Sequence, residues 1–156
     1  LCKLQWDVNC DVEYHMVDFL KAYYGEEAAP YIKQIIDIQT AQTKVSAHAF
    51  DFDWHYQAGF YPMNVAVALD GLWEKALSAN ITEEQLFNVE TANLSWEYYK
   101  ANQFLDKYTI LNPFRHKRIE ELYDSMLEHG ITKVSGFQEI PKKEDISFMQ
   151  RPYNWG

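Results

Sequence analysis

The stretch from residue 11 to residue 45 constrains the fold more than any other part of the sequence, because its helix signals agree with one another. Asp11 stands where an N-cap residue is expected, and Gly25 stands where a left-handed residue commonly ends a helix. Pro30 fits the first turn of a second helix, where its missing N–H would have had no partner. Between the first two signals, apolar residues recur at the spacing of one helix face; they are Val12, Met16, Phe19, Leu20 and Tyr23. The stretch therefore predicts a helical hairpin.

The second helix of this hairpin and the next helix have equally regular inner faces. For the second helix, the expected inner face consists of Ala28, Tyr31, Ile35, Ile38, Gln42 and Val45. For the next one, within residues 64–79, it consists of Val65, Leu69, Leu72 and Ala76, with Trp73 beside them. Thr82 and Gln85 then have capping-box spacing, which predicts the start of a helix that runs to about residue 105. That helix is apolar on two sides, as expected of a helix that lies between neighbours.

The last predicted helix opens at Asn112-Pro113 and ends at Gly130, after which Ile131 is expected to fold back onto Met126. The sequence therefore predicts an all-α fold, a bundle of about five helices with a long aromatic loop and an irregular C-terminal tail. Residues 1–156 are expected to form a single helical domain, with the irregular tail over residues 132–156.

Charge and cysteine content exclude several classes of protein. The formal net charge is −9 and no basic cluster is present, which disfavours nucleic-acid binding and adhesion to an anionic membrane. No apolar run reaches the length of about 18 residues that a membrane-spanning helix needs. The two cysteines, Cys2 and Cys10, are too few for a disulfide scaffold or a zinc site. They are either half-buried thiols or a single disulfide across the first turn.

The segment 46–62 breaks the helical pattern and contains the one cluster of polar residues that suggests a binding site. Its histidines and aspartates are spaced H-x-x-D-x-D-x-H, and they alternate with aromatic residues that suit the face of a sugar ring. The candidate substrate-binding residues are His48, Asp51, Asp53, Trp54, His55 and Tyr56. A metal site is a second interpretation, although the spacing fits no zinc pattern, and simple packing of the loop is a third. We expect no metal and no other cofactor.

One family resemblance accompanies these patterns. It is carried by Leu4-x-Trp6-Asp7-x-Asn9, by Phe19-Leu20-x-x-Tyr23-Tyr24-Gly25 and by Ala28-Ala29-Pro30-Tyr31-Ile32. These motifs resemble a bacterial family of unknown function, predicted to be glycoside hydrolases related to α-glucuronidases. In that family they mark the passage from a catalytic (β/α) barrel into a C-terminal helical region. The resemblance is specific over roughly the first forty residues and looser to Ile131, and Val8 stands where the family pattern has proline.

The resemblance implies that this chain is the C-terminal fragment of a longer, secreted or periplasmic protein, with residues 1–6 as the end of a preceding element. A glycosidase needs two carboxylates across the scissile bond, and in a barrel such groups lie at strand ends. Nearly all of the acidic residues here fall on predicted helix faces and caps, and the resemblance places the catalytic pair in the N-terminal part, so we expect no catalytic residue in this chain. The expected function is a non-catalytic accessory domain that supports the N-terminal barrel of the same protein and lines its polysaccharide cleft. The alternatives are a stand-alone helical protein-interaction module and a metal-dependent enzyme built on the segment 46–62.

Overall fold

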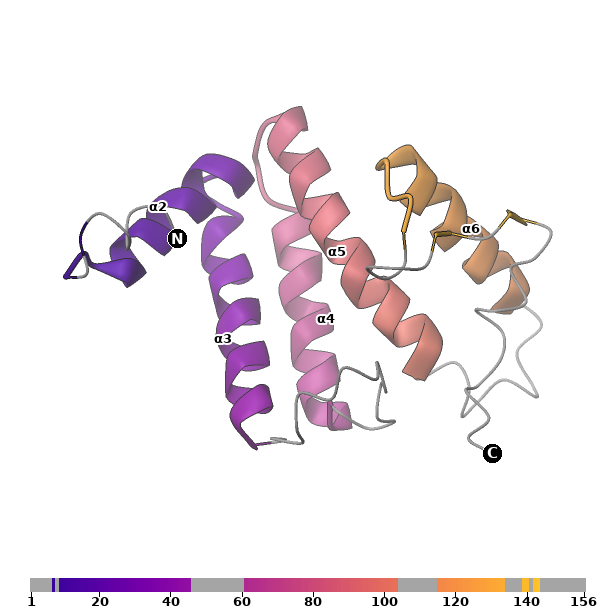
Figure 1. The fold of residues 1–156 in the computed structure, drawn as a ribbon, viewed down its shortest axis with the longest axis horizontal. Coiled ribbons are helices and arrows are strands. Elements are labelled where there is room, and N and C mark those ends of the chain that lie inside the picture. Colours follow the sequence, from indigo (N-terminus) through magenta and orange to yellow (C-terminus); the bar gives the residue numbers. More distant parts are fainter. Residues whose placement is uncertain are drawn as a thin grey trace. The chain divides into compact units, whose positions relative to one another are not determined.

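The computed structural model describes the chain over residues 7, 9–45, 61–103, 115–133, 139–140 and 142–143. Within these ranges the regular structure is helical, and the extended backbone is limited to one isolated antiparallel bridge, Lys133 with Glu139. The helices, drawn in Figure 1, are α2 (Val12–Tyr24), α3 (Ala29–Val45), α4 (Met63–Leu77), α5 (Glu83–Gln103) and α6 (Arg115–Glu128). The all-α prediction is confirmed.

The chain divides into two compact units, Leu1–Val89 and Glu90–Gly156, and the boundary falls within α5. In the first unit α2 packs against α3, and α3 packs against α4. Figure 1 shows α3 and α4 side by side and antiparallel. No helix in the described ranges has the length and hydropathy that crossing a membrane requires.

The hairpin forms for the reasons that the sequence predicts, with one difference at its turn. The Tyr14 N–H donates a 3.0 Å hydrogen bond to the Asp11 carboxylate, which caps α2. The Gly25 N–H donates to the Lys21 carbonyl, and Gly25 has φ +90° and ψ 154°. This backbone conformation is not the left-handed helical one that we expected, but its positive φ still favours glycine.

The core of the first unit is formed mostly by small and aliphatic residues of α3 and α4, with Trp73 of α4, Ala28 of the preceding turn, one residue from α2 and one from α5. Its buried members are Leu20, Ala28, Ala29, Ile32, Ile35, Ala66, Leu69, Leu72, Trp73, Ala76 and Val89. The inner face of α4 is confirmed at all but the half-buried Val65. The predicted inner face of α3 is confirmed at Ala28 and Ile35, which are buried. It is wrong at Val45, the last residue of the helix, which is 83% exposed.

The start of α5 and the end of α6 show the predicted capping. Thr82 N–H donates to the Gln85 side chain and Gln85 N–H donates to the Thr82 hydroxyl, at 3.1 and 3.2 Å, which is a complete capping box. At the other site Gly130 has φ +70° and donates to the Leu127 carbonyl, while Ile131 N–H donates to the Met126 carbonyl. These two bonds make a Schellman motif.

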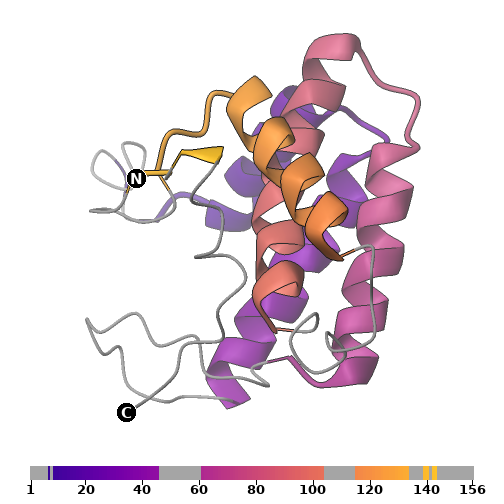
Figure 2. The same cartoon turned by 90° about the vertical axis from the view of Figure 1, so that its right-hand side faces the viewer.

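The second unit has its own core between the later part of α5 and α6. Its buried residues are Leu94, Ile119, Tyr123 and Met126, and Tyr98, Leu122, Ile131 and Ile140 pack around them. Figure 2 views this unit with α6 in front of α5. Residues on opposite sides of α5 are buried, Val89 and Trp96 on one side and Leu94 and Ala101 on the other, which confirms the prediction that α5 is covered on two faces.

Candidate functional site

The candidate residues of the aromatic segment, His48, Asp51, Asp53, Trp54, His55 and Tyr56, all lie outside the described residues. Their roles in binding a sugar therefore stay predictions. Within the described residues no three His, Cys, Asp or Glu side chains are grouped as metal ligands. Cys10 is a free, half-buried thiol.

The feature of the described structure that calls for a partner is the outer side of α2. Sequence spacing predicted a single inward stripe, but of its five residues only Leu20 is buried. Val12 is 52% exposed, Phe19 56% and Tyr23 44%. Because positions 12, 19 and 23 recur at helical spacing, these three side chains share one face of the helix. We call Val12, Phe19 and Tyr23 the α2 apolar face.

The aromatic part of the α2 apolar face is ordered by contact between its own rings. Phe19 and Tyr23 stack with ring centroids 5.3 Å apart and an interplanar angle of 15°. Tyr23 in turn meets the edge of Tyr24 at 4.9 Å. Burial of Tyr24, and after it the charge of Tyr23, raise the pKa of the Tyr24 hydroxyl, so that this phenol is neutral at physiological pH. The surface presented here contains a stacked pair of aromatic rings.

Three contacts fix the end of α2 and the turn after it to the loop between α4 and α5 and to the first turns of α5. The Asn88 side chain donates a 3.0 Å hydrogen bond to the Tyr23 carbonyl at the end of α2. The Asn80 N–H donates to the Glu27 carboxylate at 2.6 Å. Ile81 Cγ2 lies 2.5 Å from the point that a Cβ atom on Gly25 would occupy. The Ile81 side chain therefore packs against the Gly25 backbone at a distance that only glycine allows.

A polar network fixes the start of α2 to α3. Lys33 on α3 donates to Asp37 on its own helix at 2.7 Å and pairs with Glu13 on α2 at 2.9 Å. These hydrogen bonds, to Asp37 first and to Glu13 second, raise the pKa of Lys33. The lysine therefore keeps its charge throughout the physiological range, and α2 is held at both ends.

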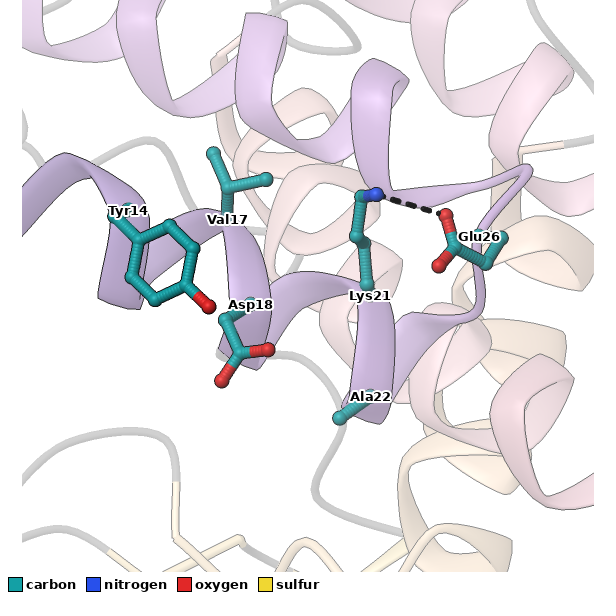
Figure 3. Close-up of a pocket in the computed structure, with 6 residues that line it drawn as sticks. All are labelled: Tyr14, Val17, Asp18, Lys21, Ala22 and Glu26. Atoms are coloured by element: carbon teal, nitrogen blue, oxygen red, sulfur yellow. Dashed lines mark ion pairs between the residues drawn. The ribbon is translucent and has the colours of Figure 1, made fainter.

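A shallow pocket of about 410 Å³ lies on a different face of α2 from the apolar one (Figure 3). Among the described residues it is lined by Tyr14, Val17, Asp18, Lys21, Ala22 and Glu26. Figure 3 shows the Tyr14 ring and the Asp18 carboxylate at one end and the Lys21–Glu26 ion pair, 3.0 Å long, at the other. The spacing of these residues along one helix face could have indicated the pocket, but nothing in their types distinguished them from an ordinary solvated surface.

In the second unit a polar cluster joins the end of α6 to α5. The Thr91 hydroxyl lies 2.6 Å from His129 Nδ1, and His129 Nε2 lies 3.8 Å from the Glu90 carboxylate. Thr91 is in the middle of a helix and half-buried. Because this arrangement ties two helices together, we assign it a structural role.

The comparisons with known proteins concern the same part of the chain as α2. Residues 1–37 match the model of a family described as a domain of unknown function, DUF4838. No curated protein matches the chain, and no solved structure does. The matched residues comprise α2 with both of its exposed faces, the turn at Gly25 and the first half of α3. Over this segment the chain is similar to that family of unknown function.

Proposed function

We propose that this chain is a non-catalytic helical accessory domain of a glycoside hydrolase that acts on polysaccharide. Its role is to support the (β/α) barrel of the same protein, which is secreted or periplasmic. The proposal rests on the motifs between Leu4 and Ile32 that resemble predicted glycoside hydrolases, and on one structural observation. The α2 apolar face is exposed in the very segment that matches a family model.

The α2 apolar face has the properties of a docking surface rather than of scattered surface residues. Isolated exposed apolar side chains are common on soluble proteins, whereas a contiguous group marks a contact. Here three apolar side chains share one helix face, two of them are stacked aromatic rings, and both ends of the helix are anchored. A rigid helix with regularly spaced apolar residues is a common way to fill a groove on a partner. The neighbouring barrel supplies that groove in our proposal.

The proposal extends to the aromatic segment 47–61, which would form part of the rim of the substrate cleft. Trp54 and Tyr56 would stack on sugar rings, and Asp51 with its neighbours would accept hydrogen bonds from hydroxyl groups. In the intact hydrolase, Trp54→Ala and Asp51→Ala should each raise the KM for polysaccharide. Unchanged sugar affinity and turnover in both variants would show that the segment has no role in the cleft.

The support role is tested with a double substitution in the intact hydrolase, Phe19→Ser with Tyr23→Ser. Both side chains are already about half exposed, so the helical unit itself should fold. Removing them from a docked interface should weaken the interface by about 2–4 kcal/mol. The measurement is the thermal unfolding of the barrel, followed by its residual polysaccharide hydrolysis after heating.

The matched control is Met63→Ser with Val67→Ser. These residues are on the outer side of α4, and their exposure, 57% and 62%, is comparable to that of Phe19 and Tyr23. The barrel should lose stability with the α2 pair and keep it with the α4 pair. Equal behaviour of the two pairs would refute the support role. If the isolated chain then bound a different protein through Phe19 and Tyr23, it would instead be a stand-alone interaction module.

A further inference from the structure

Asp18 differs from the other carboxylates of α2 and the turn that follows it. Residues 11–27 contain five carboxylates and a single lysine. Four of the carboxylates have partners: Asp11 caps α2, Glu13 pairs with Lys33, Glu26 pairs with Lys21 and Glu27 accepts from Asn80. Asp18 is exposed and, within the described part of the structure, makes neither a hydrogen bond nor an ion pair.

The surroundings of Asp18 define what it can bind. It lines the pocket of about 410 Å³, which is larger than one long side chain needs. Tyr14 beside it is 63% exposed, and its ring makes a T-shaped contact with the His15 ring, with the ring centroids 5.3 Å apart. At the far end Lys21 and Glu26 neutralise each other, so the pocket carries one net negative charge. An aromatic ring next to an unpaired carboxylate attracts a cation.

A guanidinium group fits these two features better than an ammonium group. It is planar, so it can stack on an aromatic ring, and it presents paired N–H donors to a carboxylate. It is also more weakly hydrated, so entering a shallow pocket removes less favourable hydration. An ammonium group would engage the carboxylate as a point charge, and its contact with the ring would lack the planar stacking of a guanidinium group.

We propose that the Tyr14–Asp18 pocket binds an arginine side chain of the neighbouring module that docks on α2. This inference rests on the proposed function, because it describes the surface of the module that docks on α2. That surface would have an apolar groove for Phe19 and Tyr23, and beside the groove an arginine that reaches around the helix to Asp18. Charge complementarity supports it, because the α2 segment is strongly acidic and the whole chain has a net charge of −9.

The proposal is tested on this chain alone, so its result is separate from the docking test. The isotope-labelled chain is titrated with Nα-acetyl-arginine amide at constant ionic strength, and the amide and Tyr14 ring signals are followed by NMR. Saturable shifts are expected at residues 14–26. The uncharged isostere Nα-acetyl-citrulline amide should bind about fivefold more weakly, and Nα-acetyl-lysine amide should shift the Tyr14 ring signals less than the arginine probe does.

Substitutions locate the site. Asp18→Asn should weaken binding of the arginine probe about fivefold, and Tyr14→Leu about threefold. Asp18→Glu should retain binding. The matched control is Glu128→Gln, which removes the charge of another exposed helical carboxylate and should change nothing.

Three results would overturn the proposal. One is the absence of saturable shifts with the arginine probe, and another is an equal response to arginine and citrulline. The third is a response at the same residues to methyl β-glucoside but not to arginine, which would make the pocket a saccharide site. None of these results bears on the barrel stability of the Phe19 and Tyr23 variants, so the support role stands or falls by itself.

Discussion

Gly25 and Gly130 both follow helices with a positive φ, yet their surroundings are different. At Gly130 nothing lies within 4 Å of the point that a Cβ atom would occupy. At Gly25 the same point lies 2.5 Å from Ile81 Cγ2 and 2.8 Å from Gln85 Oε1. Gly130 is required by backbone conformation alone, whereas Gly25 is required by both backbone conformation and packing.

Substituting these glycines with alanine should separate the two effects. Gly130→Ala should lower the free energy of unfolding by about 1–2 kcal/mol, from backbone strain. Gly25→Ala should lower it by about 2–5 kcal/mol, because the strain is joined by a clash with Ile81. Urea unfolding of Gly25→Ala and Gly130→Ala, with Gly71→Ala as the control, measures both losses of stability.

Gly71 is the control because it lies inside α4 with open space around its Cβ position. Alanine there should raise stability by about 0.5–1 kcal/mol, through helix propensity and a less flexible unfolded chain. A Gly25→Ala variant as stable as Gly130→Ala would show that the Ile81 contact gives way without cost.

At the scale of the helical element, Lys33 is the residue that joins α2 to α3. Its pKa is raised by its hydrogen bonds to Asp37 and Glu13, above the ordinary lysine value of about 10.4. A group with a raised pKa in the folded state stabilises the fold below its unfolded pKa, and this contribution is lost as the pH rises through the folded pKa.

Lys33→Met should therefore flatten the alkaline end of the stability curve. The parent chain should lose stability as the pH rises above about 10.4, and the variant should lose less over the same interval. Urea unfolding at stepped pH values measures this. Lys117→Met, at a side chain that is 75% exposed, should leave the alkaline slope unchanged. Equal slopes for the parent chain and Lys33→Met would contradict the raised pKa.

The helices themselves could be predicted from sequence because their signals are local. The Asp11 cap, the Thr82–Gln85 capping box and the Gly130 stop each involve residues within one or two turns. The exposure of Phe19 and Tyr23 could not be predicted, because an apolar stripe records that a helix contacts something but not whether that partner is in the same chain.

The same limit applies to the candidate site. The close packing of Ile81 on Gly25 involves a residue from another part of the sequence, so no local pattern could predict it. The pocket at Asp18 depends on which of five acidic residues has no partner, and that follows only from tertiary pairing. The aromatic segment, with Asp51 and Trp54, was the clearest candidate in sequence, and it stays a prediction outside the described residues.

At the scale of the whole molecule, the two compact units have separate cores. Ile119 is completely buried in the second unit, against Leu94, Tyr123 and Met126. The core of the first unit contains none of these residues. Separate cores allow local loss of structure in one unit without loss in the other.

Ile119→Ala should therefore act on one unit only. It should lower the stability of the second unit by about 2–5 kcal/mol, from lost burial and the cavity left behind. Hydrogen exchange should show faster exchange in α6 and unchanged protection in α2 and α3. Leu127→Ala, at a half-exposed position on α6, is the control and should change little. Equal loss of protection in both units would show that they unfold together.

The contacts that hold the end of α2 also set when that helix can take its final place. Asn80 bonds to a residue 53 positions earlier in the chain, and Asn88 to one 65 positions earlier. During synthesis the end of α2 can therefore gain these two contacts only after the ribosome has released the beginning of α5, whereas its start can already pair with α3. The helix that we propose as the docking element is thus held at both ends only after most of the first unit has been made.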